Sequence, residues 1–351
     1  MTPETSDDRG TGRHYGRSVH LVDVINLPTG YVATPYRGPD DHPAMTVVLA
    51  AYRDHIGDPE MPTVEQLDAA YSHLTDCDPE TDIALIATSA GEVVSYARPN
   101  HSDLVTGVRD CVVFAPTLPA HLTEQLFANL LDGQERHMRP WADDADSARY
   151  RAYAGHPGPG LDAIGEAAWL EAHGYTPTEW GASLVRPHLD DIPERQLPDG
   201  VELRPVEPGQ VRYIVEQHHE AFRDEWDFTE PTDDDIDREL AEPHIDPTLW
   251  KIAWSGDQVV GQVKSFINPE ENAERGYLRG YTEYISTHKD WRNRGIAGTL
   301  LAMSLSELKT RGMTEAALGV DTNNPGGAFQ LYTSLGFELQ HYEATYTKPI
   351  S

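Results

Sequence analysis

The sequence predicts a mixed α/β protein made of two tandem domains with a common plan. The chain has 351 residues, which is more than one ordinary hydrophobic core holds. The pattern L-P-x-G-x-x-x-x-P occurs at residues 27–35 and again at 197–205, an offset of 170 residues. Each half also ends with a helical stretch, a glycine and an aromatic residue, Gly174–Tyr175 and Gly336–Phe337. Together these matches indicate a tandem duplication.

Composition divides the chain into three parts. Residues 1–17 carry almost no apolar side chains and are expected to form a disordered tail. Residues 18–190 form the first predicted domain and residues 191–351 the second. A proline- and charge-rich segment at 186–194 is the predicted linker.

Strand and helix signals follow one another through the second half. Apolar periodicity and turn residues predict a strand at 202–204, helices at 211–222 and 233–240, and a hairpin at 249–254 and 258–266. The predicted elements that follow are a strand at 280–287, a helix at 296–310, a strand at 315–320, a helix within 324–335 and a strand at 337–346. This order predicts a mixed, mainly antiparallel sheet flanked by helices.

The chain is strongly acidic, with 27 Lys and Arg against 58 Asp and Glu, so that 27 − 58 gives a net charge of −31. This charge disfavours nucleic acid and anionic membranes as partners and weakly favours a cationic amine, although acidic residues also serve solubility. Cys77 and Cys111 form neither a C-x-x-C motif nor a disulfide framework. Without an apolar leader or a membrane-length apolar run, the sequence predicts a cytoplasmic protein.

One glycine turn is a candidate phosphate site. Gly295 follows a predicted strand and opens a predicted helix, whose first N–H groups attract anions. Arg292 and Arg294 flank the glycine, and the small residues Ala297 and Gly298 leave the helix start uncrowded. Taken alone, such a turn is more often an ordinary loop-to-helix junction than a phosphate site.

Two ordered motifs connect this turn to a known family. The segment R-N-R-G-I-A at 292–297, followed by Leu300 and Leu301, resembles the core motif of the GNAT superfamily of N-acetyltransferases. About 30 residues later, N-P-G-G-A-F-Q-L-Y-T-S-L-G-F at 324–337 resembles the second GNAT motif. The resemblance covers residues 199–348, and the two-domain plan is similar to tandem GNAT proteins of the mycothiol-synthase type.

The resemblance implies acetyl-CoA as acyl donor and no metal. In the family the cofactor lies where two parallel strands part, here those predicted at 280–287 and 315–320. The backbone of Ile285, Ser286 and Thr287 would pair with the pantetheine arm, and Thr287 departs from the valine usual in the family. The pyrophosphate would lie near Arg292 and be held by the N–H groups of Arg294, Gly295, Ile296, Ala297 and Gly298.

An alkylammonium must lose a proton before it attacks a thioester, and Glu283 is the candidate base. Strand alternation places Glu283 on one face with Tyr281, Ile285 and Thr287. A cross-strand ion pair or a solvated edge carboxylate explains Glu283 equally well.

The resemblance assigns Tyr332 as the acid that protonates the departing CoA thiolate, whereas the alternative is a core aromatic. Asn324 either contacts the cofactor or caps the helix that Pro325 would open. Residues 222–228 mix aromatics with carboxylates and fit either a cationic acceptor or core packing. His218 and His219 lack a third ligand at metal spacing and are expected on a helix surface.

The first half lacks these motifs. Its corresponding region, 111–124, has no glycine or flanking arginine and contains two prolines, and Leu170 stands where the second half has Tyr332. We expect a degenerate GNAT-like domain without an acyl-CoA site that serves as scaffold, acceptor-site wall or partner surface. Residues 144–162 are expected to be an inserted loop.

The sequence therefore predicts an acetyl-CoA-dependent N-acyltransferase acting on a primary amine of a small molecule. Three alternatives stay open: an acyl carrier protein as donor, which the negative charge mildly disfavours, a protein or peptide amine as acceptor, and a non-catalytic CoA-binding sensor. The oligomeric state stays open as well.

Overall fold

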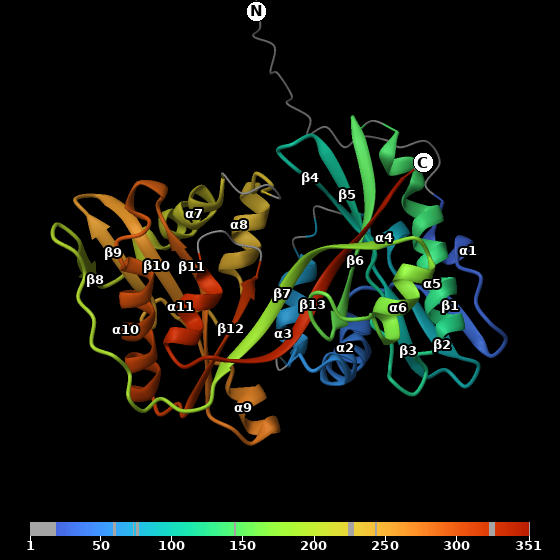
Figure 1. Cartoon of the computed structure of the whole chain (residues 1–351). Coiled ribbons are helices and arrows are strands. Elements are labelled where there is room, and N and C mark those ends of the chain that lie inside the picture. The colour runs from blue at the N-terminus through green and yellow to red at the C-terminus, as the bar shows by residue number, and fades with distance from the viewer. Residues whose placement is uncertain are drawn as a thin grey trace, which may run out of the picture.

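The computed structural model describes residues 19–58, 61–72, 74, 77–143, 145–223, 228–242, 244–322 and 327–350. Within them, two halves lie side by side and repeat one order of elements (Figure 1). The mixed α/β class and the tandem plan are thus confirmed.

The described elements of the first half, with 3-10 helices labelled η, are α1 (Leu21–Val24), β1 (Tyr31–Pro35), η1 (Pro39–Asp41), α2 (His42–Ile56), α3 (Val64–Ser72), α4 (Pro79–Asp82), β2 (Ala84–Thr88), β3 (Val93–Ala97), β4 (Asn100–Asp103), β5 (Val108–Val112), α5 (Glu124–Met138), η2 (Arg139–Ala142), β6 (Ser147–His156), α6 (Gly165–Ala172) and β7 (Thr176–Arg186). Those of the second half are β8 (Glu202–Arg204), η3 (Pro208–Gln210), α7 (Val211–Phe222), α8 (Asp233–Leu240), β9 (Lys251–Ser255), β10 (Gln258–Phe266), α9 (Pro269–Arg275), β11 (Arg279–Thr287), η4 (Lys289–Trp291), α10 (Ile296–Thr310), β12 (Glu315–Asp321), α11 (Ala328–Ser334) and β13 (Glu338–Pro349).

The two halves exchange their last strands. Among the described residues, one ten-stranded sheet runs in the order β4-β5-β6-β13-β7-β12-β11-β10-β9-β8. The last strand of the second half, β13, pairs with β6 of the first, with Tyr346 opposite Ala152. In return, β7 pairs with β12, with Leu184 opposite Leu318. Because the sheet crosses the predicted boundary near residue 190, the division into separate domains there stays a prediction.

One predicted loop is wrong. The stretch 144–162 was expected to be an insertion, yet residues 147–156 form β6 in the middle of the shared sheet. Every second side chain, at Tyr150, Ala152 and Ala154, is buried, as expected for a strand with one face packed on the core. The glycines at 155, 158 and 160 suggested a loop, but they lie at or beyond the end of this strand. Asp144 itself lies outside the described residues.

The sequence also missed α9, which joins the two halves. Asn268 caps this helix by accepting a hydrogen bond from the N–H of Glu271, and its amide donates to the carbonyl of Met61 in the first half at 3.3 Å. Glu271 accepts a hydrogen bond from the N–H of Met61, also at 3.3 Å, and Arg275 forms an ion pair with Asp54. These contacts hold the first half against the second.

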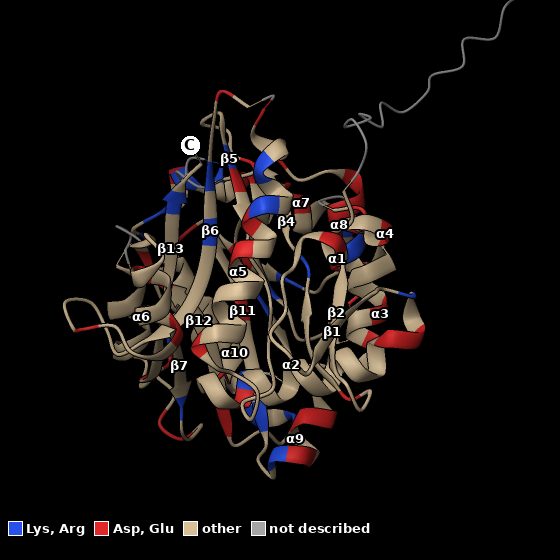
Figure 2. Ribbon diagram, turned by 90° about the vertical axis from the view of Figure 1, so that its right-hand side faces the viewer, with Lys and Arg blue, Asp and Glu red and all other residues tan. Residues whose placement is uncertain are grey.

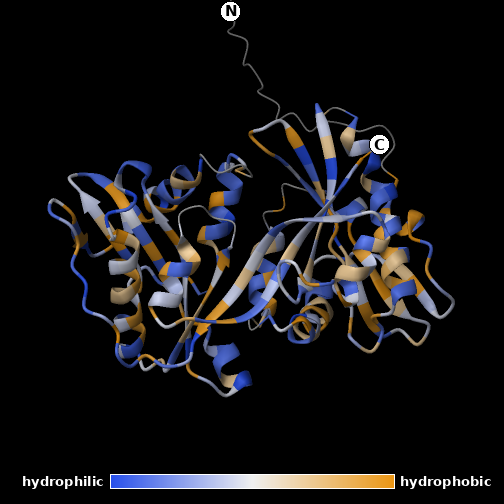
Figure 3. Cartoon of the chain, in the orientation of Figure 1, coloured by the Kyte–Doolittle hydropathy of each residue, from blue (hydrophilic) through white to orange (hydrophobic). Residues whose placement is uncertain are grey.

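The core that supports the site lies between the sheet and α10. Leu300, Leu301, Leu305 and Leu308 of α10 are fully buried there, against sheet residues such as Leu184. Figure 3 shows hydrophobic segments along the shared strands and hydrophilic residues along the helices' outer surfaces. Two glycines allow the close approach of α10: a Cβ on Gly261 would lie 2.5 Å from Ile296, and one on Gly280 would lie 2.5 Å from Leu308.

Acidic residues are spread over many helices, while Lys and Arg gather on β6 and β13 (Figure 2). These basic residues have acidic partners: Arg149 and Arg151 contact the buried Asp110, and Lys348 contacts Glu135. These basic residues of β6 and β13 therefore neutralise acidic residues of the first half and do not form an open site for a polyanion.

Candidate active site

A cleft opens where β11 and β12 part. The parallel pairing of these strands runs from Arg279 opposite Glu315 to Tyr281 opposite Ala317 and stops there, although both strands continue. The gap beyond encloses about 400 Å³, within the range of cofactor sites. Seven of the predicted residues line it together: Glu283, Ile285, Ser286, Thr287, Arg292, Ala297 and Tyr332.

A β-bulge at Tyr284 changes the face assignment made from alternation. Glu283 pairs with Lys264 and Ser286 with Gln262, so that Tyr284 and Ile285 together oppose the single residue Val263. Tyr284 has a φ of 50°, which is unusual for a residue other than glycine. Beyond the bulge Thr287 pairs with Gly261, so the prediction that Glu283 shares a face with Ile285 and Thr287 is wrong. Instead, Glu283 shares its face with Tyr281 and Ser286.

Glu283 and Tyr332 reach the gap from different sides of the sheet. Lys264 and Gln262, the neighbours of Glu283 on its face, contact α8 and α7. Tyr332 belongs instead to the core beside α10 and is only 6% exposed. Oε1 of Glu283 accepts a hydrogen bond from the N–H of Gly319 on β12 at 3.0 Å. Burial, and secondly the charge of Glu283, raises the pKa of the Tyr332 hydroxyl above its ordinary value, so this hydroxyl stays protonated.

The glycine turn has the geometry of an anion-binding helix start. Gly295 is the N-cap of α10 with a φ of 79°, a left-handed conformation that favours glycine. The guanidinium of Arg292 lines the cleft and donates to the carbonyl of Ala221 at the end of α7, at 2.7 Å. Arg294 donates to the carbonyl of Asp290 and stacks on Trp291 at 4.6 Å from the ring centroid. The two arginines thus stabilise the turn as well as carrying charge.

Other predicted cofactor contacts lie around the cleft without lining it. The side chain of Ile296 is buried in the core, and Gly295 and Arg294 are exposed at the turn. Gly298 is buried, and a Cβ there would lie 2.3 Å from Arg195. For these residues only the backbone N–H groups are relevant to a phosphate. Asn324 falls outside the described residues.

His218 and His219 are not simple surface residues. His218 lines the cleft, with its ring edge towards Tyr284 at 5.4 Å between ring centroids. Burial, and secondly the nearby charge of Lys264, lowers the pKa of His218 to about 3, which keeps the ring neutral. Its position in the sequence could have indicated this, because His218 lies four residues after the buried Ile214 and three after the buried Val215 on α7.

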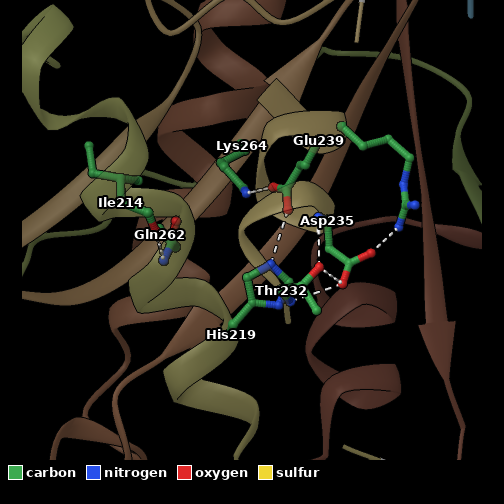
Figure 4. A network of polar contacts seen from close by, with 8 residues as sticks. Ile214, His219, Thr232, Asp235, Glu239, Gln262 and Lys264 are labelled. Atoms are coloured by element: carbon green, nitrogen blue, oxygen red, sulfur yellow. Dashed lines mark hydrogen bonds and ion pairs between the residues drawn. The ribbon is translucent and has the colours of Figure 1, made fainter. Parts of the chain in front are cut away.

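A buried ion pair holds α8 against the sheet beside the cleft (Figure 4). Lys264 of β10 contacts Glu239 of α8, which also hydrogen bonds to His219 at 3.1 Å. Burial alone would raise the pKa of Glu239, but hydrogen bonding to His219 and Lys264 lowers it to about 2. The ammonium of Lys264 also lies over the ring of Tyr284, 4.1 Å from its centroid. No sequence motif identifies this network, because its members come from separate elements.

The cleft continues into the space between the two halves. Glu283 also lines an adjoining space of about 310 Å³, together with Asp58 of the first half and Glu242. A further space of about 510 Å³ lies between Tyr71 and Arg98 on one side and Glu242 and Tyr284 on the other. The first half therefore forms one wall of the space in front of Glu283.

Comparison with known proteins agrees with this geometry. Residues 212–337 match the sequence profile of the Acetyltransferase (GNAT) family. The segment 212–337 is therefore identified as a GNAT acetyltransferase domain. A mycothiol acetyltransferase from Thermobispora bispora is 26% identical over 265 residues, which cover 75% of this chain and 83% of that protein.

Solved structures share the fold over almost the whole chain. A GCN5-related N-acetyltransferase from Sphaerobacter thermophilus superposes with a TM-score of 0.67 at 22% identity, covering 93% of this chain and 97% of that one. A tandem GNAT protein from the clavulanic acid biosynthesis pathway superposes with a TM-score of 0.63 at 13% identity, covering 92% of this chain and 98% of that one. The tandem GNAT architecture thus has known counterparts.

Two further observations concern the described part of the chain. No group of three His, Cys, Asp or Glu side chains in it is placed to hold a metal ion. None of its helices is long and apolar enough to cross a membrane.

Proposed function

We propose that the protein transfers an acetyl group from acetyl-CoA to a primary amine of a small molecule, with Glu283 as base and Tyr332 as acid. The observation that carries the proposal is that the carboxylate of Glu283 and the protonated phenol of Tyr332 both line the gap between β11 and β12. The glycine turn at the start of α10 supports acyl-CoA binding, because it offers backbone N–H groups and Arg292 near the same gap.

The proposed reaction is a direct transfer. Glu283 accepts a proton from the bound ammonium, directly or through a water, and the neutral nitrogen attacks the thioester carbonyl. The nitrogen of the tetrahedral intermediate loses its second proton to water, and the intermediate collapses, with the carbon–sulfur bond breaking as Tyr332 donates its proton to the sulfur. Glu283 then releases its proton to solvent. The products are the amide and CoA, and the tyrosine regains a proton from solvent.

Glu283 is a better candidate base than His218, although both line the cleft. A general base works best when its pKa lies near the operating pH. With a pKa of about 3, His218 binds a proton even more weakly than an ordinary carboxylate does. The position of Glu283 on both the cofactor cleft and the space between the halves also favours it.

Acidic side chains support an amine acceptor. Asp58, Glu242 and Glu283 line the space in front of the cofactor cleft, where an ammonium group would be stabilised. The relatives named mycothiol acetyltransferase indicate a small-molecule acceptor. A panel of primary amines identifies which one.

The proposal is tested by following CoA release from acetyl-CoA over a panel of primary amines. For the best amine, Glu283→Gln should lower kcat about 100-fold at pH 7 and less at pH 9, where more of the amine is already neutral. Glu274→Gln on α9 is the matched control and should leave the rate unchanged. Acetyl-CoA binding without CoA release from any amine would favour a sensor, and an unchanged rate in Glu283→Gln would overturn its role as base.

A further inference from the structure

The first half keeps a chamber at the place that corresponds to the cofactor cleft. The chamber encloses about 280 Å³ and is lined from α2, the segment that follows β5, α5, β6, α6 and β13. The cofactor cleft is lined from the equivalent elements of the second half, namely α7, β11, α10, β12 and α11. The duplicated fold has therefore retained a second cavity with a different lining.

This chamber is not built for acyl-CoA. The chain between β5 and α5 contains Pro116 and Pro119, which lack the N–H groups a phosphate would need. At the start of α5 the Thr123 hydroxyl already accepts the N–H of Leu126, at 3.3 Å. The glycine turn and arginines of the second half have no counterpart at this helix start.

The chamber combines an apolar wall with partly buried carboxyl groups. Phe127, Leu130 and Leu170 form much of the wall. The Tyr52 hydroxyl of α2 donates a hydrogen bond to Oε2 of Glu166 on α6, at 3.0 Å. Glu343, which β13 contributes through the strand exchange, also lines the chamber.

The position of Glu166 can be compared directly with the second half. Leu170 and Tyr332 each lie four residues before a glycine, at 174 and 336. Glu166 lies four residues before Leu170, and Ala328 lies four residues before Tyr332. The chamber therefore has the carboxylate of Glu166 at the position where the cofactor cleft has the small residue Ala328. This difference adds a negative charge to the chamber when Glu166 is ionised.

The charges that face Glu166 leave room for a cation. Arg53 of α2 forms an ion pair with Asp58 at 3.4 Å, while Tyr52, Tyr153 and Glu343 are the other titratable groups in the lining. Burial raises the pKa of Glu166 to about 7, although the hydrogen bond from Tyr52 opposes this effect. Burial and the charge of Asp58 also raise the pKa of Glu343, although the charge of Arg53 opposes this effect. Carboxylates buried in this way are stabilised by a paired positive charge.

We propose that the chamber is a second ligand site, separate from acyl transfer, which binds a small apolar organic cation with its ammonium group at Glu166. The apolar wall would cover the hydrocarbon part, and the carboxyl groups would hold the charged end. The Tyr52 hydroxyl would keep the Glu166 carboxylate in position.

Calorimetry on the full chain, with benzylamine as the probe and benzyl alcohol as its uncharged analogue, tests the proposal. Benzylamine should bind at least tenfold more tightly than benzyl alcohol. Glu166→Gln should weaken benzylamine binding at least tenfold, whereas the matched variant Glu171→Gln, at an exposed position of the same helix, should leave it unchanged. Equal binding of the amine and the alcohol would overturn the proposal.

A second variant guards against a folding defect in Glu166→Gln. Ala115→Leu fills the chamber from the segment that follows β5 and should also abolish binding while the thermal unfolding temperature stays near that of the parent. Binding that persists in both variants would overturn the proposal.

The chamber must also be distinguished from the acceptor site. Benzylamine binding should persist in Glu283→Gln, and binding lost there but kept in Glu166→Gln would assign the amine to the acceptor site alone. Affinity should rise from pH 6 to pH 8 as Glu166 ionises and level off above, and this rise should vanish in Glu166→Gln. A pH profile unchanged by Glu166→Gln would contradict the assignment of the charged end.

Discussion

The carboxylate of Glu283 on β11 and the N–H of Gly319 on β12 form a hydrogen bond of 3.0 Å across the gap where the two strands part. This contact holds the carboxylate at the mouth of the cleft while the strands themselves no longer pair. It also explains how one side chain lines both the cleft between β11 and β12 and the space between the halves.

Replacing Tyr332 by Phe removes the proposed acid and keeps the buried ring. We expect kcat for acetyl transfer to fall about 100-fold, since general acid catalysis typically contributes at least this much. The Michaelis constant for acetyl-CoA should change little, and CoA release measures both. Tyr342→Phe, at a partly buried tyrosine packed against the same core, is the control and should retain the parental rate. If Tyr332→Phe kept the full kcat, Tyr332 would not be the acid, and its ring would serve only to pack the core.

Replacing Gly295 by Ala tests the turn at the start of α10. Gly295 has a φ of 79°, and Gly312 beyond the other end of the helix has a φ of 88°. An alanine at either position should cost about 1 kcal/mol of stability, because a Cβ disfavours this conformation. Only Gly295→Ala should also weaken acetyl-CoA binding, measured by calorimetry. Equal loss of binding in the Gly312→Ala control would mean that the effect is general destabilisation.

Replacing Lys264 by Met leaves the buried Glu239 without its ammonium partner. We expect the free energy of unfolding to fall by about 3 kcal/mol, since breaking a buried pair leaves an uncompensated charge. Adding Glu239→Gln to Lys264→Met should recover much of this loss, and urea unfolding measures both variants. Should the double variant be no more stable than the single one, the pair would not be the source of the effect.

The lowered pKa of Glu239 predicts a pH dependence. Its pKa is about 2 in the folded protein against an ordinary value of 4.5, so the ionised form stabilises the fold above pH 4.5. This contribution is lost as the pH falls from about 4.5 to about 2. The stability difference between the parent and Glu239→Gln should therefore shrink over this interval, as measured by urea unfolding at successive pH values. A difference that stays constant would contradict the depressed pKa.

Elements with strong local signals were predicted closely. The helices α7, α8 and α10 and the strand β10 have the predicted bounds, because apolar periodicity, capping residues and turns mark them along the chain. Arg292, Ala297 and Tyr332 were found because they sit in two motifs of fixed spacing, and Glu283 because it is a carboxylate on the strand before the first motif. The structure brings all four to one cleft.

Other features gave no local signal. The strand β6 resembled a loop because glycines follow it, and its pairing partners β5 and β13 lie far away in the chain. The bulge at Tyr284 depends on pairing with β10, and it reversed the expected face of Ile285 and Thr287. His218, Glu239 and Lys264 meet only because three separate elements pack together.

The sequence by itself determined the α/β class, the repeated plan, the glycine turn and the second motif, since these depend on neighbours within a few residues. Only the tertiary structure decided the strand exchange between the halves, the wall that the first half places before Glu283, and the chamber at Glu166. The physical reason is that each of these arises from pairing and packing between segments distant in the chain, whose contacts are decided by the whole fold and not by local propensity.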